Sequence, residues 1–310
     1  MPKFTVAKSA HINASPERVF EFVSDFGTWT KWSPWLAAQS DPSVVVSENS
    51  NSVGSQYSWE GDVVGKGSIQ HMELVPGKSI EDKLQILKPW KSQSNVRFDF
   101  AGSDEGTEIT WTMNGSLPLM LFWMKSMMVN MIGMDYARGL KMLGELIETG
   151  SIQSQTKIRG IETVGPLHMV GVRTNAKMDD IDKVMEAALT EVSSKLTDVC
   201  LAEEGAGISV YHDMNMKTCV LDFTSGFLVQ DPNISVPGLS LWSLPECKAF
   251  TVEHVGKYEH LGNPWNAAYQ NVRYKKLKQN KKAGTFEIYR NDPKETDPKD
   301  LVTEVFLPLK

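Results

Sequence analysis

The chain has 310 residues, of which 41% are hydrophobic and 23% are charged, and its formal net charge is -6. Length and composition favour two domains of ordinary globular character and exclude a disordered or fibrous chain. The negative net charge gives no field that gathers nucleic acid or an anionic membrane surface, so we expect neither as a partner.

The cysteines and the N-terminal residues argue against a disulfide-rich, metal-binding, secreted or membrane-spanning protein. The three cysteines, Cys200, Cys219 and Cys247, are odd in number and widely spaced, which indicates neither a disulfide framework nor a thiolate metal site. Residues 1–8 lack the apolar core of a secretory signal, and the methionine-rich run 117–132 is too short and too interrupted to cross a bilayer. We therefore expect a cytoplasmic protein with buried thiols, no metal and no cofactor.

The first half of the sequence predicts a sheet closed by a long helix. A strand is expected over 4–12, and Ser15 then supplies a capping hydroxyl, Pro16 a first helical residue and Glu17 an acidic first turn. Pro118 opens a helical segment that we expect to reach about residue 148. Short alternating strands separated by turn residues predict one curved antiparallel sheet over 55–60, 65–74, 79–87, 94–100 and 107–113.

Methionine is concentrated in and just before that helical segment, where eight of the fifteen methionines fall between residues 113 and 142. One interpretation is a helix packed into the core. The other is a flexible, polarisable face that lines an apolar cavity between helix and sheet. The candidate ligand contacts of this half are Trp59, Trp111, Met124, Met127 and Met131.

The order of these features resembles the polyketide cyclase/dehydrase branch of the START-like (SRPBCC) superfamily over residues 3–148. The resemblance is carried by Trp-Ser-Pro-Trp at 32–35, Tyr-Ser-Trp-Glu-Gly at 57–61, Gly-Thr-Glu-Ile-Thr-Trp at 106–111 and the closing helix. It implies a helix-grip fold around an apolar cavity for lipids, hormones or polyketides. That family shares no catalytic residue set, so none is assigned here.

A polar stretch without periodicity, residues 150–156, is typical of a linker, so we place the domains at 1–149 and 157–310. Two similar sets of elements follow this linker, and each set consists of strands and one helix. In this internal repeat residues 208–213 match 286–291, and Phe223 corresponds to Phe306. The predicted fold class is α+β throughout: a helix-grip domain followed by a pseudo-symmetric, duplicated strand-helix-strand-strand domain.

The last strand, residues 301–309, is apolar on both faces and places Glu304 among apolar neighbours. A buried carboxylate that stays unpaired raises its pKa, whereas a paired one holds a cation, a hydroxyl donor or a basic side chain. Two interpretations stay open for Glu304: a structural ion pair or solvent-reaching residue, and a carboxylate on the floor of a pocket.

Residues 157–310 resemble the GyrI-like family, also known as the AraC-type effector-binding domain. The resemblance is carried by the His-x-Gly-x-Tyr element at 254–258 and by the closing strand that contains Glu304. It implies a groove for amphipathic, often cationic molecules, with Glu304 facing the ligand. The further candidate contacts are Tyr211, Phe223, Tyr258, Tyr289 and Phe306, and the tyrosine that accompanies Glu304 is left open.

Together these patterns predict a two-module protein that binds an apolar or amphipathic small molecule, cationic ones included. The alternative is a hydrolase in which Glu304 acts as general base. A third possibility is a regulatory protein that binds another protein, although no interface for one is evident. GyrI-like regulators carry a helix-turn-helix before the ligand-binding domain. In this chain a START-like domain precedes it instead, and no DNA-reading element is evident.

Overall fold

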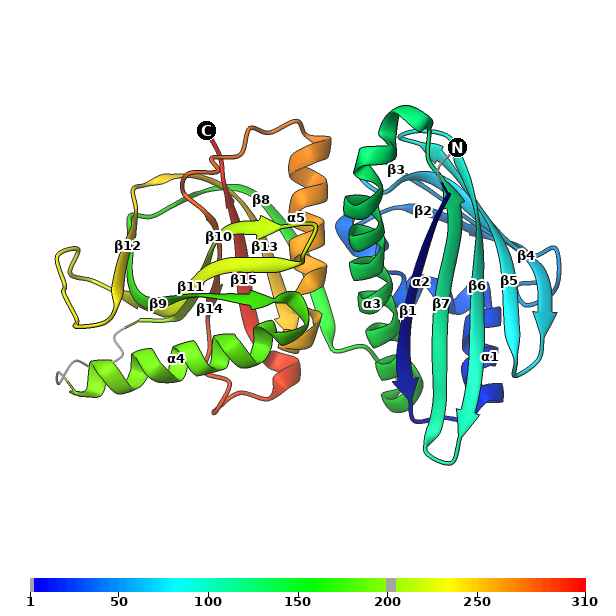
Figure 1. Cartoon of the computed structure of the whole chain (residues 1–310), viewed down its shortest axis with the longest axis horizontal. Helices are drawn as coiled ribbons and strands as arrows, with labels where there is room; N and C mark the ends of the chain where they lie inside the picture. The colour runs from blue at the N-terminus through cyan, green and yellow to red at the C-terminus, as the bar shows by residue number, and fades with distance from the viewer. Residues whose placement is uncertain (1–2, 199–204) are drawn as a thin grey trace. The chain divides into compact units, whose positions relative to one another are not determined.

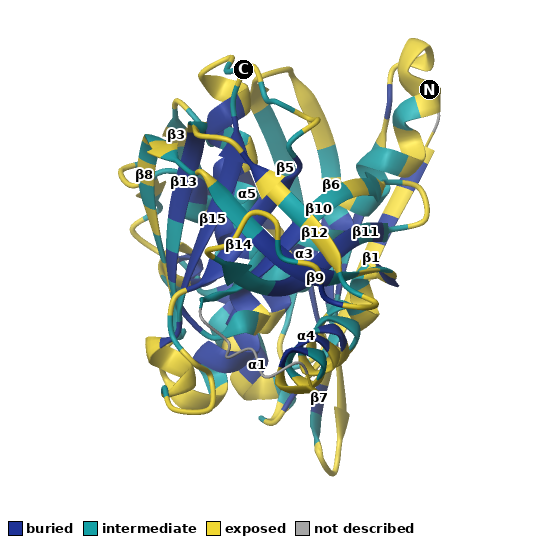
Figure 2. Ribbon diagram, turned by 90° about the vertical axis from the view of Figure 1, so that its left-hand side faces the viewer, coloured by how far each residue is buried: buried dark blue, intermediate teal, exposed yellow. Residues whose placement is uncertain are grey.

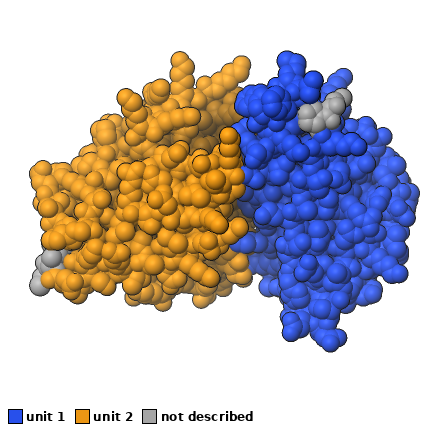
Figure 3. Space-filling view, in the orientation of Figure 1, with its two compact units in different colours: residues 1–152 blue, residues 153–310 orange. Residues whose placement is uncertain are grey.

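The computed structural model describes residues 3–198 and 205–310, so the predicted buried thiol of Cys200 lies outside the described residues. The chain forms two compact units, residues 1–152 (unit 1) and 153–310 (unit 2), coloured separately in Figure 3. In the described residues each unit is one antiparallel sheet with its own helices (Figure 1). This architecture confirms the predicted α+β fold class.

Unit 1 is built on a seven-stranded sheet within the described residues, in the order β1-β7-β6-β5-β4-β3-β2. The edge strand β2 was not predicted, because four residues are too few for alternation to be recognised. The strands are β1 (Lys3–Ile12), β2 (Ser43–Val46), β3 (Gln56–Gly61), β4 (Gly65–Val75), β5 (Ser79–Lys88), β6 (Ser92–Ser103) and β7 (Gly106–Ser116).

The helical segments of unit 1 are α1 (Pro16–Ser24), α2 (Phe26–Trp32), η1 (Leu36–Ala38), η2 (Leu119–Met124) and α3 (Lys125–Thr149). As predicted, α1 is capped by Ser15, whose Oγ accepts the N–H of Arg18. The single long helix expected from Pro118 is instead the 3-10 segment η2 followed by α3. None of the η2 residues is buried, so no packed face stabilises an α-helix there.

Stacked rings join the helices of unit 1 to one face of its sheet. Trp111 of β7 stacks on Phe98 of β6 at 5.0 Å between ring centroids and on Tyr136 of α3 at 3.8 Å. Trp32 of α2 meets Trp111 edge-on at 5.7 Å. Helices α2 and α3 therefore cover the same face of the sheet, and the core lies between them and the strands.

Unit 2 is built on an eight-stranded sheet in the described residues, in the order β12-β9-β11-β10-β14-β15-β13-β8. About the central pair β10 and β14, the orders β10-β11-β9 and β14-β15-β13 mirror each other, which confirms the predicted duplication. The strands are β8 (Ser154–Val164), β9 (Leu167–Lys177), β10 (Gly207–Asn215), β11 (Val220–Val229), β12 (Ser240–Leu244), β13 (Cys247–Gly256), β14 (Thr285–Tyr289) and β15 (Val302–Pro308).

The helical segments of unit 2 are η3 (Met178–Asp180), α4 (Ile181–Asp198), η4 (Tyr258–His260), α5 (Gly262–Tyr274) and η5 (Pro298–Asp300). Helix α5 ends at Tyr274, shortly before Lys276, which adopts a left-handed backbone conformation with φ 53°. Strand β8 begins at Ser154, inside the stretch expected to be linker, where Ser154 pairs with Gly256. Of the described helices, none is long and apolar enough to cross a membrane.

Alternation along β14 decides which side chains face the helices of unit 2. Phe286 and Phe306 pair across β14 and β15 and stack at 4.8 Å, so they share one face. Glu287 points to the opposite face, where Trp265 of α5 contacts it. Figure 2 shows β13 and β15 largely in the colour of buried residues. The central strand β14 thus has all five residues buried, with a carboxylate directed toward α5.

Candidate functional site

Glu287 is the centre of the candidate site in unit 2, and its side chain is only 1% exposed. The Tyr211 hydroxyl donates to Oε1 at 2.8 Å, and the Tyr289 hydroxyl donates to the same oxygen at 2.7 Å. The indole N–H of Trp265 donates to Oε2 at 2.7 Å. Three neutral donors therefore fix the carboxyl group from two strands and one helix, which favours its ionised form.

The structure shows no cation beside this carboxylate among the residues that it describes. Within residues 3–198 and 205–310, Glu287 makes no ion pair with a lysine, arginine or histidine. Burial raises the pKa of Glu287, the hydrogen bonds from its three donors oppose that shift, and the negative charge of Asp182 on α4 adds to it. A buried carboxylate without a counter-ion is costly, and such groups are concentrated at functional sites.

The tyrosines of the site remain protonated donors at neutral pH. Burial is the main cause that raises the pKa of Tyr211 and of Tyr289 well above the ordinary range, and Glu287 adds to both shifts. Burial, then Glu287 and Asp292, raise the pKa of Tyr258 to about 12. Each hydroxyl therefore keeps its proton and can direct it at a carboxylate or a ligand oxygen.

Aromatic rings connect the buried carboxylate to the surface along α5. Tyr211 meets Trp265 edge-on at 5.2 Å, and Trp265 in turn stacks on Tyr269 at 6.0 Å. Tyr269 is 46% exposed. Tyr258 lies 5.4 Å from the ring of Tyr289, on the same side of the sheet. We refer to Tyr211, Tyr258, Trp265, Tyr269 and Tyr289 as the aromatic wall of the Glu287 site.

The internal repeat explains why Glu287 lies at the centre. Strands β10 and β14 pair antiparallel with Ser209 opposite Glu287, and this pair lies where the two halves of the duplication meet. Sequence reasoning missed both Glu287 and Trp265. The internal repeat could have identified Glu287. It aligns Glu287 with Ser209, so one repeat has a charged residue at a strand position where the other has a small one.

Glu304 lies in an ion-pair cluster and not on the floor of a pocket, which was one of the two interpretations of its sequence position. One of its oxygens accepts from Arg159 and the other from Arg290, whose Nε lies 2.6 Å away, and the Glu304 side chain is 10% exposed. Glu304 pairs across the sheet with Ile288 and therefore faces away from Glu287. This geometry favours the structural ion pair that the sequence left open.

The structure brings some of the sequence-predicted residues together and separates others. Tyr211, Tyr258 and Tyr289 gather around Glu287, and Phe223 packs beside Tyr211 at 6.0 Å. Phe306 lies on the opposite face of the sheet, against Phe286. The tyrosine left open in the sequence is therefore paired with Glu287 rather than with Glu304.

In unit 1 the sequence-predicted residues are spread between the core and the surface. Trp111 is enclosed by the rings of Phe98 and Tyr136. Trp59 is half-buried against Tyr57, with 6.2 Å between ring centroids. Met124 and Met127 are half-buried and Met131 is exposed.

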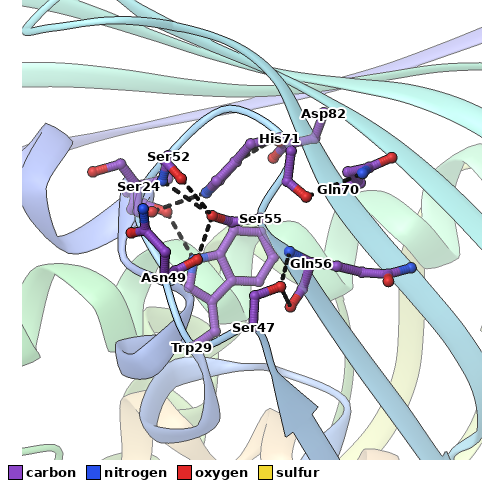
Figure 4. Close-up of polar contacts among 12 residues, drawn as sticks. Ser24, Trp29, Ser47, Asn49, Ser52, Ser55, Gln56, Gln70, His71 and Asp82 are labelled. Atoms are coloured by element: carbon purple, nitrogen blue, oxygen red, sulfur yellow. Dashed lines mark hydrogen bonds and ion pairs between the residues drawn. The ribbon is translucent and has the colours of Figure 1, made fainter.

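A second polar cluster lies inside unit 1, where His71 of β4 and Asp82 of β5 are cross-strand neighbours (Figure 4). His71 Nδ1 lies 2.6 Å from Asp82 Oδ1, its Nε2 lies 2.8 Å from the Ser24 carbonyl oxygen, and its ring stacks on Phe26 at 3.8 Å. Because a carbonyl only accepts, Nε2 carries a proton, and one further proton is held between Nδ1 and the carboxyl group. Burial raises the pKa of Asp82, and the hydrogen bond from His71 opposes that shift.

On the strands of the unit 1 sheet, three buried side-chain atoms have no hydrogen-bond partner within the described part of the chain: Tyr57 Oη, Asp82 Oδ2 and Trp111 Nε1. All three residues belong to strands of the sheet, and each side chain is almost fully enclosed. Unpaired buried donors and acceptors are costly, and a bound water or a polar group of a guest molecule is the usual way to satisfy them.

Two protein-family models match the chain, one in each unit. Residues 3–148 match the family described as polyketide cyclase / dehydrase and lipid transport, and residues 160–310 match the GyrI-like small molecule binding domain. The chain is thus a fusion of a START-like cyclase/dehydrase domain with a GyrI-like domain, as its sequence predicted. It is a two-domain protein of a small-molecule-binding kind.

Several solved structures are similar to part of the chain. Protein CV1439 from Chromobacterium violaceum is 20% identical, with 46% of this chain and 97% of that one covered and a TM-score of 0.37. The Aha1 dimer from Colwellia psychrerythraea is 18% identical, with 47% and 98% covered and a TM-score of 0.36. Protein SA2116 from Staphylococcus aureus is 13% identical, with 48% and 96% covered and a TM-score of 0.40. A search of curated proteins gave no match.

The His71–Asp82 pair makes unit 1 sensitive to the loss of either partner. Asp82→Ala leaves His71 Nδ1 buried without an acceptor, so we expect the free energy of unfolding to fall by about 3–5 kcal/mol. Chemical denaturation of the full chain, followed by tryptophan fluorescence, measures this loss. Glu60→Ala is the matched control, because Glu60 pairs with Lys66 at the exposed edge of the same sheet. Equal midpoints for the two variants would show that the buried pair is not stabilising.

His254 gives unit 2 a pH-dependent stability. Burial and then the charge of His260 lower the pKa of His254 to about 4, whereas an unfolded histidine titrates near ~6.5. Between these values the unfolded chain binds the extra proton, so stability is lost as the pH falls through this window, by about 3 kcal/mol in total. Urea unfolding of His254→Gln between the two pH values is expected to show a correspondingly weaker loss. An unchanged loss would assign the pH dependence to other groups.

Proposed function

We propose that unit 2 binds a small, largely aromatic organic cation at Glu287. The observation that supports this proposal is the buried Glu287 carboxylate, which has three neutral hydrogen-bond donors and no cationic partner in the described residues. A ligand that carries the missing positive charge converts an unfavourable buried anion into a neutral pair. Selectivity for cations over neutral molecules of the same shape follows from that difference.

The aromatic wall supplies the remaining affinity. Organic cations are attracted to the faces of Trp and Tyr rings by about 0.5–2 kcal/mol per contact, and more where water is excluded. Trp265 and Tyr258 are half-buried, so the contact surface of a ligand would begin at these rings and end at the carboxylate. Ligand sites of this kind are mostly apolar with few placed polar groups.

Unit 1 supplies a second binding module in this proposal, for an apolar or amphipathic molecule. Its family resemblance and the unpaired Tyr57 Oη, Asp82 Oδ2 and Trp111 Nε1 support that role. A polar group of a guest molecule that reached one of these atoms would satisfy it. The free thiols of Cys219 and Cys247 are consistent with action in a reducing cytosol.

The hydrolase alternative has less support. A general base needs an accessible lone pair, whereas both oxygens of Glu304 are bound by arginines. We therefore do not propose hydrolysis at Glu304.

The charge of Glu287 is tested with N-phenylpyridinium and its neutral isostere biphenyl, measured by calorimetric titration of the full chain. We expect the pyridinium to bind more tightly than biphenyl. Glu287→Gln keeps the shape of the side chain but removes its charge, so it should weaken the pyridinium by about 2 kcal/mol, roughly 30-fold, and leave biphenyl unchanged.

Glu304→Gln is the matched control, because it neutralises a carboxylate on the opposite face of the same sheet. Its affinity for the pyridinium should equal that of the unmodified protein. Trp265→Phe retains an aromatic ring without the N–H donor and should weaken binding less than Glu287→Gln does. The proposal is wrong if Glu287→Gln is folded and binds the cation as tightly as before, or if only Glu304→Gln weakens it.

A further inference from the structure

One segment of unit 1 exposes consecutive large apolar side chains. All five residues of Leu119–Trp123, in η2, are exposed, with Met120 at 82% and Trp123 at 66%. Trp90, in the turn between β5 and β6, is exposed as well. Single exposed apolar residues are ordinary, but a contiguous group of this size marks an interaction surface.

The register of the sheet places these residues at one end of unit 1. Lys3 at the start of β1 pairs with Ser116 at the end of β7, immediately before η2. The backbone of Gly115 closely approaches Ser94 near the start of β6, so the β5–β6 turn is at the same end.

Lysines lie among these apolar residues. Lys88 and Lys91 flank Trp90, Lys125 follows η2 directly, and Lys3 is beside its start. We call Lys3, residues 88–91 and residues 119–125 together the apical surface. It contains no carboxylate, although the chain as a whole has a net charge of -6. The acidic residues of this end, Asp41, Glu60 and Asp62, belong to the β2–β3–β4 side, where Glu60 pairs with Lys66 and Lys88.

We infer that the apical surface docks unit 1 onto a lipid bilayer that contains anionic headgroups. Trp, Phe, Leu and Met side chains enter the boundary between headgroups and acyl chains, while lysines beside them contact the negative headgroups. A two-fold contact between copies of this chain would place lysines against lysines, which is unfavourable. The local charge thus reverses the expectation, taken from net charge alone, that a membrane surface is not a partner.

The test is co-sedimentation of the full chain with vesicles of phosphatidylcholine alone or mixed with phosphatidylserine. We expect binding to the mixed vesicles, and weaker binding as salt is added, because surface electrostatics are screened. Each lysine near an anionic surface contributes roughly fivefold to partitioning, so Lys91→Gln combined with Lys125→Gln should lower it by about 25-fold. Phe122→Ser combined with Trp123→Ser should lower it by about tenfold or more.

Val53→Ser is the matched control, because Val53 is equally exposed but lies in the β2–β3 connection, at the other end of the sheet. It should sediment like the unmodified protein. Three outcomes overturn the inference: no binding to mixed vesicles, equal binding by the apical variants, or a concentration-dependent dimer that these variants abolish while vesicles are not bound. The last outcome would assign the surface to self-association. None of these results depends on a ligand at Glu287, so the two proposals fail separately.

Discussion

The structure of unit 2 is organised around a buried carboxyl group, that of Glu287, which makes no ion pair within the described residues. Glu287 lies on a central strand, is held by Tyr211, Tyr289 and Trp265, and is surrounded by rings that keep water away. Donors fix where the charge is, and burial makes it costly to keep. Under the proposed function, a cationic guest would relieve that cost without rearranging the three donors, so the site would be preorganised for it.

Much of the fold was accessible from the sequence because its signals are local or repeated. Ser15 and Pro16 fix the start of α1, alternation fixes the strands of both sheets, and the repeat between 208–213 and 286–291 anticipates the mirrored strand order about β10 and β14. The elements that were missed, β2 and β12, are short edge strands. The sequence predicts an α-helix over segment η2, because composition alone does not show that the apolar side chains there pack against nothing.

The site was harder to predict, since its decisive contacts are distant in sequence. Glu287 and Glu304 both occur in apolar strands, so the reasoning that selected Glu304 applies equally to Glu287. What separates them is Arg159, which is 145 residues before Glu304 in the chain and comes to it only through the pairing of β8 with β13. The resemblance named Tyr211, Tyr258 and Tyr289 together, and the structure gathers them around Glu287. Which carboxylate they contact depends on the face that each strand presents.

The most direct test of this account is the pKa of Glu287, measured by carbon NMR on the side-chain carboxyl and assigned by the signal lost in Glu287→Gln. In the free protein we expect the Glu287 carboxyl group to titrate above the ordinary carboxyl range, because burial outweighs the three donors in setting its pKa. Saturation with N-phenylpyridinium should lower that pKa, since a bound cation stabilises the ionised form. An ordinary pKa that the cation leaves unchanged would contradict the central claim that Glu287 is a buried, uncompensated charge awaiting a positive ligand.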